Sequence, residues 1–428
     1  MKSLRRIITA GALAILARLV IRKYKPKIVM VTGSVGKTST KDAVAAALGT
    51  SFFVRKSEKS YNSEFGVPLT ILGASNPWLN LFNWLGVFKE AFALIMLPNH
   101  YPKVLVLEVG ADRPGDLARI LRIATPDAVV VTRLPEVPVH VEAYTNPQAV
   151  RDEEFAPAYA LAPGAPLIIS ADDSYAVKMA SRLDVQMSTY GVSAHAHVKI
   201  EHSGLALEHG KPVGMKANIH VGTAHEKVLV RGAVGEQQLL PAAAAVVTTL
   251  ALGATLENAL EGLANYAPPP GRTRLLEGLH GSILIDDSYN ASPAAVEEGL
   301  KALHLIPAKR HIAVLADMLE LGRYSVTEHE RIGALAAQQA DMVIGVGIRS
   351  RALAASARTI LSEEGQVLSF DTARETIEPL RTLIREGDAL LIKGSQSMRM
   401  ERLVEALLAD PLDSAKLVRQ EHEWKRKL

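Results

Sequence analysis

The sequence predicts an α/β protein built from doubly wound sheets. Continuous apolar runs end in turns and alternate with helical segments, as at "KIVMVTG", "KVLVLEVG" and "DAVVVTR". Such runs are typical of parallel strands buried on both faces, and their alternation with helices favours a doubly wound sheet. The chain has 428 residues, which is too many for one ordinary hydrophobic core. We therefore expect two or three domains.

Composition and charge exclude several classes of protein. Hydrophobic residues at 48% and charged residues at 22% are typical of a soluble globular chain rather than a disordered one. The net charge of only +3 gives no general argument for nucleic-acid binding, so we expect no nucleic-acid partner. The chain has no cysteine, which excludes a disulfide framework, a thiolate nucleophile and a cysteine zinc site. We expect a cytoplasmic monomer that acts on small molecules.

Residues 1–26 form a basic and apolar segment. No Asp or Glu occurs in residues 1–41. The run "IITAGALAILARLVI" is too short for a transmembrane span and is interrupted by Arg18, and no signal-peptide cleavage site follows it. Two interpretations stay open: an amphipathic helix lying at the inner face of an anionic membrane, or a helix packed on the protein. The aromatic stretch 76–98 suits a buried or interfacial helix, with core packing as the default.

A proline-rich segment divides the chain. The string "YAPPPGRTR" at 266–274 stops any helix and favours extended chain. In the central domain, residues 27–268, alternating polarity at 192–232 predicts a small antiparallel excursion, and an alanine-rich helix is expected after it. In the C-terminal domain, residues 269–428, a second α/β sheet is predicted from the runs "SILIDDS", "HIAVLADM", "MVIGVG", "QVLSF" and "DALLIKGS".

The strongest functional signal is the string "VTGSVGKTSTKDAVAAAL" at 31–48. Gly33 and Gly36 permit a tight turn whose backbone N–H groups converge on phosphate oxygens. Lys37 can reach the outer phosphates, and the Thr38 hydroxyl can bind Mg²⁺. The helix N-terminus that follows adds a favourable dipole. We predict a nucleotide site made of Gly33, Ser34, Val35, Gly36, Lys37, Thr38 and Ser39.

Polar residues follow other predicted strands. Glu108 ends a buried strand at the sheet edge where ligands bind, and it is well placed to hold Mg²⁺ against the γ-phosphate. His140 follows another strand and is a candidate metal ligand or substrate contact, although a lone histidine in a loop is more often structural. The acids at 152–154 are by default a solvated helix face.

The C-terminal domain also carries polar groups at its strand ends. In "LIDDSYNASP", Asp286, Asp287 and Tyr289 are candidates to contact the ribose or base of a nucleotide held between domains. In "LIKGSQSMRMERL", Lys393 and Ser395 precede a predicted helix N-terminus, which suits an anionic group such as a carboxylate.

Taken in order, these segments resemble the Mur ligases, the ATP-dependent amide-bond-forming enzymes of bacterial peptidoglycan assembly. The resemblance covers residues 31 to about 408. The strings "DDSYNASP", "DMLELG" and "KGSQSMRMER" are similar to those of the member that adds D-alanyl-D-alanine to a muramyl tripeptide. The glycine spacing of the loop matches the family's short G-x-x-G-K-[TS]. The resemblance implies a P-loop-type central domain and a Rossmann-like C-terminal domain.

The resemblance also implies a mechanism and a set of residues. ATP phosphorylates a substrate carboxylate to an acyl phosphate, which an incoming amine attacks, so positioning and charge neutralisation dominate the catalysis. Lys37 and Thr38 would hold the phosphates and Mg²⁺, Glu108 would hold Mg²⁺, and His140 would serve a second metal. ATP would also be contacted by Arg272, Asp287 and Tyr289, and the muramyl peptide and D-Ala-D-Ala by Asn62, Asn290, Lys393, Ser395 and Arg399.

The sequence departs from the family pattern in three places. Glu154 stands where the family has a carbamoylated lysine, and we hypothesise that its carboxylate replaces the carbamate oxygen, which completes a metal set of Thr38, Glu108, His140 and Glu154. Gln237 and Gln238 replace the family's His-Asn pair near the adenine. We expect the family's N-terminal UDP-binding domain to be absent, with residues 1–26 in its place. The acceptor would then be held by its peptide and sugar alone, or be presented as a lipid-linked precursor.

Two other functions are weighed against this one. A ligase similar to folylpolyglutamate synthase would use another acceptor, and the C-terminal strings speak against it. A catalytically inactive Mur-like scaffold would keep the fold but bind no ATP, and the intact glycine loop speaks against that.

Overall fold

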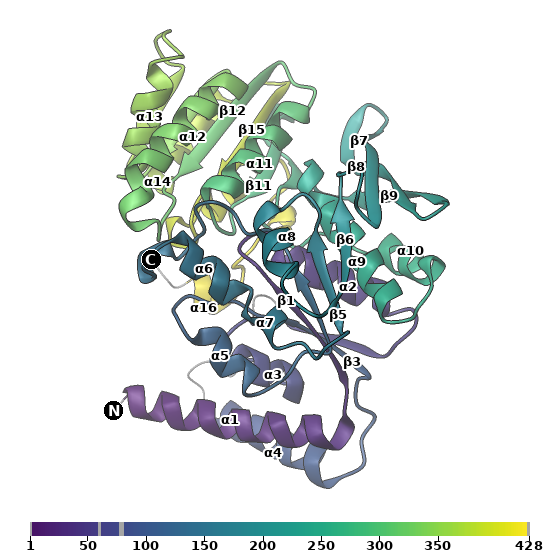
Figure 1. Cartoon of the computed structure of the whole chain (residues 1–428). Helices are drawn as coiled ribbons and strands as arrows, with labels where there is room; N and C mark the ends of the chain where they lie inside the picture. The colour runs from purple at the N-terminus through teal and green to yellow at the C-terminus, as the bar shows by residue number, and fades with distance from the viewer. Residues whose placement is uncertain (1, 59–60, 77–80, 426–428) are drawn as a thin grey trace.

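The computed structural model describes residues 2–58, 61–76 and 81–425 (Figure 1). Residue 1 of the N-terminal segment and residues 77–80 of the aromatic stretch lie outside this part of the chain. Among the described ranges, none of the helices combines the length and the apolar character needed to cross a bilayer.

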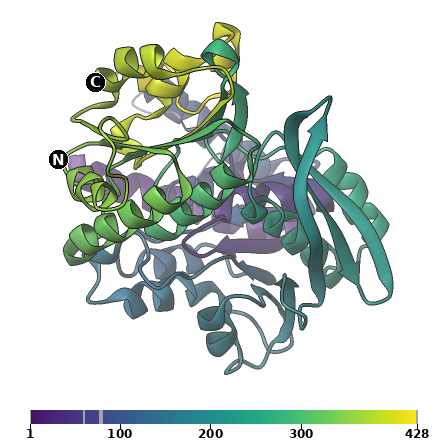
Figure 2. The ribbon, with the colours of Figure 1, turned by 90° about the horizontal axis from the view of Figure 1, so that it is seen from above.

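The first sheet has nine strands, and the seven strands from β2 to β7 in the order given next run parallel to one another. The order across the sheet is β2-β3-β1-β4-β5-β6-β7-β8-β9. The antiparallel excursion expected at 192–232 is formed by β7, β8 and β9, whose long teal strands stand at one side of the molecule in Figure 2. The strands are β1 Lys27–Thr32, β2 Val54–Lys56, β3 Val104–Glu108, β4 Ala128–Val131, β5 Pro166–Ser170, β6 Gln186–Gly191, β7 Val198–Glu208, β8 Lys211–Val221 and β9 Ala224–Arg231.

Helices cover both faces of this sheet because its strands are apolar on both sides. Alternate side chains of a strand point to opposite faces, so Val29 and Val31 of β1 pack in one core while Ile28 and Met30 pack in another. The first core includes α2 Lys37–Leu48, α9 Leu240–Ala251 and α10 Leu256–Ala264. The second includes α3 Gly66–Leu72, α5 Asp116–Leu121, α7 Ala156–Tyr159 and α8 Ser174–Ala180. Helix α6, Pro147–Glu154, precedes α7.

The second sheet has six strands in the order β10-β11-β15-β12-β13-β14. The five runs expected from the sequence are the parallel strands, and the antiparallel edge strand β10 was not expected. One face packs on α11 Pro293–Leu305, α12 Ser325–Gln339 and α13 Ser350–Arg358, and the other on α14 Ala373–Leu383 and α15 Glu401–Leu407. The strands are β10 Arg274–Glu277, β11 Ile283–Asp287, β12 Arg310–Ala316, β13 Met342–Val346, β14 Val367–Phe370 and β15 Asp388–Lys393.

The predicted fold class is confirmed by these two parallel-rich sheets. Along the chain, one sheet precedes the proline-rich segment and the other follows it. The exact domain bounds at 26/27 and 268/269 stay a prediction. Outside the first sheet, α1 Lys2–Tyr24 and α4 Leu81–Met96 contact each other and α3. Helix α1 is therefore packed on the protein along one face, with Leu13, Ala17 and Val20 fully buried.

Candidate active site

The glycine loop joins β1 to α2 in a conformation that its glycines permit. Gly33 has φ +114° and Gly36 has φ +91°, a region that residues with a Cβ rarely adopt. A Cβ on Gly33 would also lie 2.4 Å from the Thr132 hydroxyl oxygen. The Ser34 amide donates to the Arg133 carbonyl at 2.9 Å, and Val35 forms a bridge with the same residue. The loop is thus attached to the end of β4.

Lys37, the first residue of α2, lies over this loop. Its ammonium group donates to the Gly33 carbonyl, and its charge opposes the rise that burial causes in the pKa of both Glu108 and Glu154. The side chains of Lys37 and Asn62 both border Gly110, so Asn62 lies beside the lysine. The Lys37 ammonium is therefore held against the loop backbone and acts electrostatically on two buried carboxylates.

Glu108 is a buried carboxylate whose hydrogen bonding is incomplete. It ends β3 next to β1 and is 1% exposed. The Thr38 hydroxyl donates to its Oε1 at 3.2 Å, whereas its Oε2 has no hydrogen-bond partner within the described structure. The ammonium group of Lys41 lies 4.0 Å from Oε2. Burial raises the pKa of Glu108, and the charges of Lys41, Lys37 and Arg272 oppose that shift.

The donors at this point fit a divalent cation. A buried carboxylate oxygen without a hydrogen-bond partner is costly, and the Glu108 Oε2 atom is such an oxygen within the described structure, although the Lys41 ammonium lies 4.0 Å away. Carboxylate and hydroxyl oxygens are the ligands that Mg²⁺ takes beside nucleotide phosphates. Thr38 and Glu108 together thus have the chemistry of a Mg²⁺ site at the start of α2.

Glu154 is buried against the loop and not on a solvated helix face. Its carboxylate accepts a hydrogen bond from the Ser34 hydroxyl, and its backbone carbonyl accepts from the Thr32 hydroxyl at 2.5 Å. Burial raises the pKa of Glu154, and the charge of Lys37 is the largest effect that opposes this rise. Glu153 accepts from the Gly115 and Leu117 amides. The default expectation for the acids at 152–154 was wrong for these two because tertiary contacts bury α6, and it holds for the exposed Asp152.

His140 is placed at a contact between the two halves of the molecule. Its Nδ1 lies 2.7 Å from a carboxylate oxygen of Glu320, and its Nε2 lies 3.5 Å from one of Asp112. Burial by itself would lower the pKa of His140, but the hydrogen bond and charge of Glu320 outweigh it and the pKa is raised. Within the described residues, no three His, Asp or Glu side chains are grouped like the ligands of a metal ion. The four-residue metal set expected from the sequence therefore stays a prediction.

Residues at the ends of β11 and β15 form a second polar cluster. The Lys393 ammonium, buried at the end of β15, lies 2.6 Å from an Asp287 carboxylate oxygen and donates to the Asn290 carbonyl at 3.0 Å. Burial lowers the pKa of Lys393, and the charge of Asp287 opposes this. The Arg272 guanidinium stacks 4.1 Å from the Tyr289 ring centre. The charge of Arg272 opposes the rise that burial causes in the pKa of Glu108 and adds to the fall that burial causes in the pKa of Lys393.

The remaining predicted residues are engaged in structural contacts. The Ser395 hydroxyl accepts from the Leu319 amide at 2.9 Å, one residue before Glu320. The Arg399 guanidinium pairs with Glu401 at 2.6 Å. The Gln238 amide donates to the Arg272 carbonyl at 3.2 Å. Gln238 thus attaches the start of α9 to the linker that carries Arg272.

Sequence reasoning missed Glu320 and Lys41. Glu320 belongs to "DMLELG", which follows a predicted strand, so its position at a strand end was an available signal. Lys41 lies one helical turn beyond Lys37 and is 1% exposed, with its ammonium donating to the Ser57 carbonyl at 2.7 Å. A lysine in a predicted helix carries no sign of such burial.

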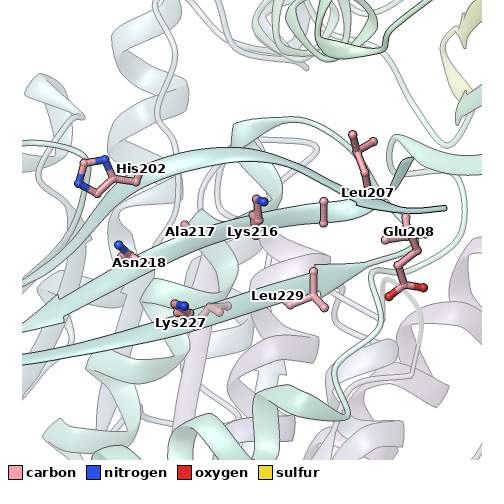
Figure 3. A pocket seen from close by; sticks show the side chains of 11 residues that line it. His202, Leu207, Glu208, Lys216, Ala217, Asn218, Lys227 and Leu229 are labelled. Carbon is pink, nitrogen blue, oxygen red and sulfur yellow. The ribbon is translucent and has the colours of Figure 1, made fainter. Parts of the chain in front are cut away.

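A cavity of about 460 Å³ lies elsewhere, on the face of the β7–β9 extension (Figure 3). Figure 3 shows His202, Lys216, Asn218 and Lys227 along its strands. None of the residues of the two polar clusters lines it. We therefore assign the candidate site to the glycine loop and not to this cavity.

Comparison with known proteins agrees with this geometry. The Mur ligase middle domain model matches residues 31–248, and the Mur ligase glutamate ligase domain model matches residues 271–396. The UDP-N-acetylmuramoyl-tripeptide–D-alanyl-D-alanine ligase of Bacillus subtilis is 26% identical over 406 residues, which cover 94% of this chain and 80% of that enzyme.

Solved structures show the same likeness. The MurF ligase of Thermotoga maritima, in complex with ADP, is 26% identical with a TM-score of 0.76, and the match covers 93% of this chain and 83% of that one. The folylpolyglutamate synthase of Mycobacterium tuberculosis, also with ADP, is 15% identical with a TM-score of 0.66 over 95% of each chain, a likeness of fold alone. Since the middle-domain model by itself matches more than half of the sequence, the chain belongs to the Mur ligase family.

Proposed function

We propose that this chain is an ATP-dependent ligase of peptidoglycan precursor synthesis that forms an amide bond. It joins D-alanyl-D-alanine, or a similar amine, to the carboxylate of a muramyl peptide through an acyl phosphate. The names of its relatives support this. The observation that carries the proposal is the Glu108 Oε2 atom, which has no hydrogen-bond partner within the described structure and lies beside Thr38 and the glycine loop, because a metal ion held with the nucleotide would take this oxygen as a ligand.

The glycine loop is the proposed phosphate site. The backbone amides of residues 33–39 and the N-terminus of α2 provide donors for phosphate oxygens. Lys37 would leave the Gly33 carbonyl for the outer phosphates, and Thr38 and Glu108 would hold Mg²⁺. When bound, Mg²⁺ neutralises charge on a transferring phosphoryl group. Lys37, Glu108, His140 and Glu154 are the residues that we assign to catalysis.

Glu154 is proposed to serve in place of the family's carbamoylated lysine. Its buried carboxylate already faces the Ser34 hydroxyl and the Lys37 charge, so it can orient both without carbon dioxide. His140 is held by Glu320 from the other half of the chain, and we propose that this contact helps to close the two halves around the substrates.

The C-terminal residues are proposed to complete the nucleotide and substrate sites. Arg272 and Tyr289 form a stacked pair, the charge of Arg272 opposes the rise that burial causes in the pKa of Glu108, and Asp287 is oriented by Lys393. The carboxylate substrate and the incoming amine would be contacted by Asn62, Asn290, Lys393, Ser395 and Arg399. We further propose a monomer that works in the cytoplasm.

The decisive experiment measures product as well as phosphate. Purified chain, ATP and Mg²⁺ are incubated with D-Ala-D-Ala and either a nucleotide-linked or a lipid-linked muramyl tripeptide, and the amide product is identified by mass spectrometry. Phosphate release that requires both substrates is the expected result. A folate substrate with glutamate, in a parallel arm, tests the alternative acceptor. Failure of every arm, together with no thermal stabilisation by an ATP analogue and Mg²⁺, would favour an inactive scaffold.

A further inference from the structure

Helices α1 and α4 form an outer layer at one end of the molecule (Figure 1). Both contact α3, and every residue of α3 is buried. Their C-terminal ends are joined, because the Lys23 ammonium donates to the Leu94 carbonyl at 2.8 Å and to the Leu97 carbonyl at 2.6 Å. The Tyr24 hydroxyl donates to the same Leu94 carbonyl at 2.7 Å. The two helices are therefore one connected surface.

The outer face of α1 is apolar although it is not covered by described residues of the protein. Ile8, Ile15 and Leu19 are 62%, 53% and 39% exposed, and their spacing of seven and four residues places them on one helical face. The opposite face buries Leu13 and Val20.

The outer face of α4 repeats this pattern. Leu85, Phe92 and Met96 are 67%, 57% and 75% exposed, again with spacings of seven and four residues that keep them on one face. Val87 and Ala91 are buried on the other face. Since both helices bury their other faces toward the body of the protein, the two apolar stripes point outward. Large exposed apolar patches on a soluble domain mark an interaction site.

Basic residues accompany these stripes. Arg18 and Arg22 are exposed on α1, and Lys89 is exposed on α4. No acidic residue occurs in residues 1–41, and Glu90 is the only one in residues 65–107. The chain as a whole carries a net charge of only +3, so positive charge is concentrated here. The complementary partner is therefore both apolar and anionic.

We propose that the surface formed by the outer faces of α1 and α4, the α1–α4 surface, docks on an anionic lipid bilayer. The stripes enter the boundary between headgroups and acyl chains, and the arginine and lysine side chains reach the lipid phosphates. Strand β1 begins at Lys27, three residues after α1 ends, and carries the glycine loop at its other end. The active site therefore lies at the far end of β1, and docking leaves it accessible to ATP.

The test is co-sedimentation of the full chain with vesicles. One set contains phosphatidylglycerol and phosphatidylcholine in equal parts, and the other contains phosphatidylcholine alone. We expect binding to the anionic set only, weakened by salt because charge contributes. Phe92→Ser with Met96→Ser, and separately Arg18→Glu with Arg22→Glu, should each weaken binding about tenfold or more. Leu412→Ser, which removes an apolar side chain that is 82% exposed on another surface, should leave it unchanged.

Several results would overturn the proposal. Equal binding to both vesicle sets, no binding by the unmodified chain, or unchanged binding by both double variants would each do so. Sedimentation velocity without vesicles tests a second copy of the chain as the occupant. Concentration-dependent dimers that Phe92→Ser with Met96→Ser abolishes would assign the surface to self-association instead. Vesicle binding involves no step of the ligase reaction, so its failure and the failure of the proposed function are separate results.

Discussion

Replacing Lys393 by methionine should destabilise the C-terminal domain strongly. Lys393 and Asp287 form a buried pair, with side chains 2% and 8% exposed and 2.6 Å between their charged atoms. The substitution keeps the length of the side chain but removes the charge and the hydrogen bond to the Asn290 carbonyl. The Asp287 carboxylate then retains the Thr273 amide, at 3.2 Å, but loses its counter-charge.

The expected magnitude follows from the cost of an uncompensated buried charge. Removing one partner of a buried ion pair costs about 3–5 kcal/mol, so the free energy of unfolding in urea should fall by about that amount for Lys393→Met. Combining it with Asp287→Asn should restore at least half of the loss, because the remaining group is then neutral. A double-mutant cycle gives the coupling energy between the two side chains.

The assay is urea unfolding of the four proteins, followed by far-ultraviolet circular dichroism, with KM values for ATP and for the dipeptide in parallel. A loss below about 1 kcal/mol for Lys393→Met, with a raised KM for the dipeptide alone, would refute the structural argument. It would instead support the direct substrate contact that the sequence suggests. A large loss of stability with a raised KM for ATP would support a role in orienting Asp287.

Three further predictions concern the loop and the contact between the two halves. Gly33→Ala should destabilise the chain by about 1–3 kcal/mol and abolish thermal stabilisation by ADP. Gly36→Ala should cost less stability, because its Cβ would lie no closer than 4.0 Å to any neighbour. Equal losses of stability in the two variants would contradict the steric argument. Glu154→Ala should abolish ligation at all Mg²⁺ concentrations. The activity of the parent should not respond to added bicarbonate. Full activity of the variant would reject the proposed role of Glu154. Glu320→Gln should cost up to about 1 kcal/mol, since the pair is partly exposed. In the folded chain the pKa of His140 is raised and the pKa of Glu320 is lowered. The ion pair therefore stabilises the chain between these two folded pKa values. Its contribution is lost as the pH falls through the pKa of Glu320 and as the pH rises through the pKa of His140. If the free energies of unfolding of Glu320→Gln and of the parent differ by a constant amount across this pH range, that result would argue against the ion pair.

Much of the fold was predictable because it depends on local pattern. Short apolar runs such as those of β3 and β4 are buried on both faces, and a strand of that kind has few alternatives to the centre of a parallel sheet. The edge strand β10 was missed because its residues are only partly buried and its pairing with β11 depends on chain that follows it.

The glycine loop was also predictable, since its conformation is specified by neighbouring residues. Positive φ angles require Gly33 and Gly36, and the lysine and threonine follow directly at the start of α2. Glu108 was found through a general rule that places ligands at strand ends. Their assigned roles in binding ATP and Mg²⁺ stay predictions.

What the sequence by itself determined is thus most of the parallel strands and the conformation of the glycine loop, because a short stretch of chain carries the information for each. Only the tertiary structure decided which charges meet. Glu154 lies against Ser34 across 120 residues, and Lys393 meets Asp287 across 106. It also decided that α1 packs on α3 and α4 with an apolar face still exposed. Such pairings depend on how distant segments approach one another, and neither composition nor periodicity encodes that approach in any single segment.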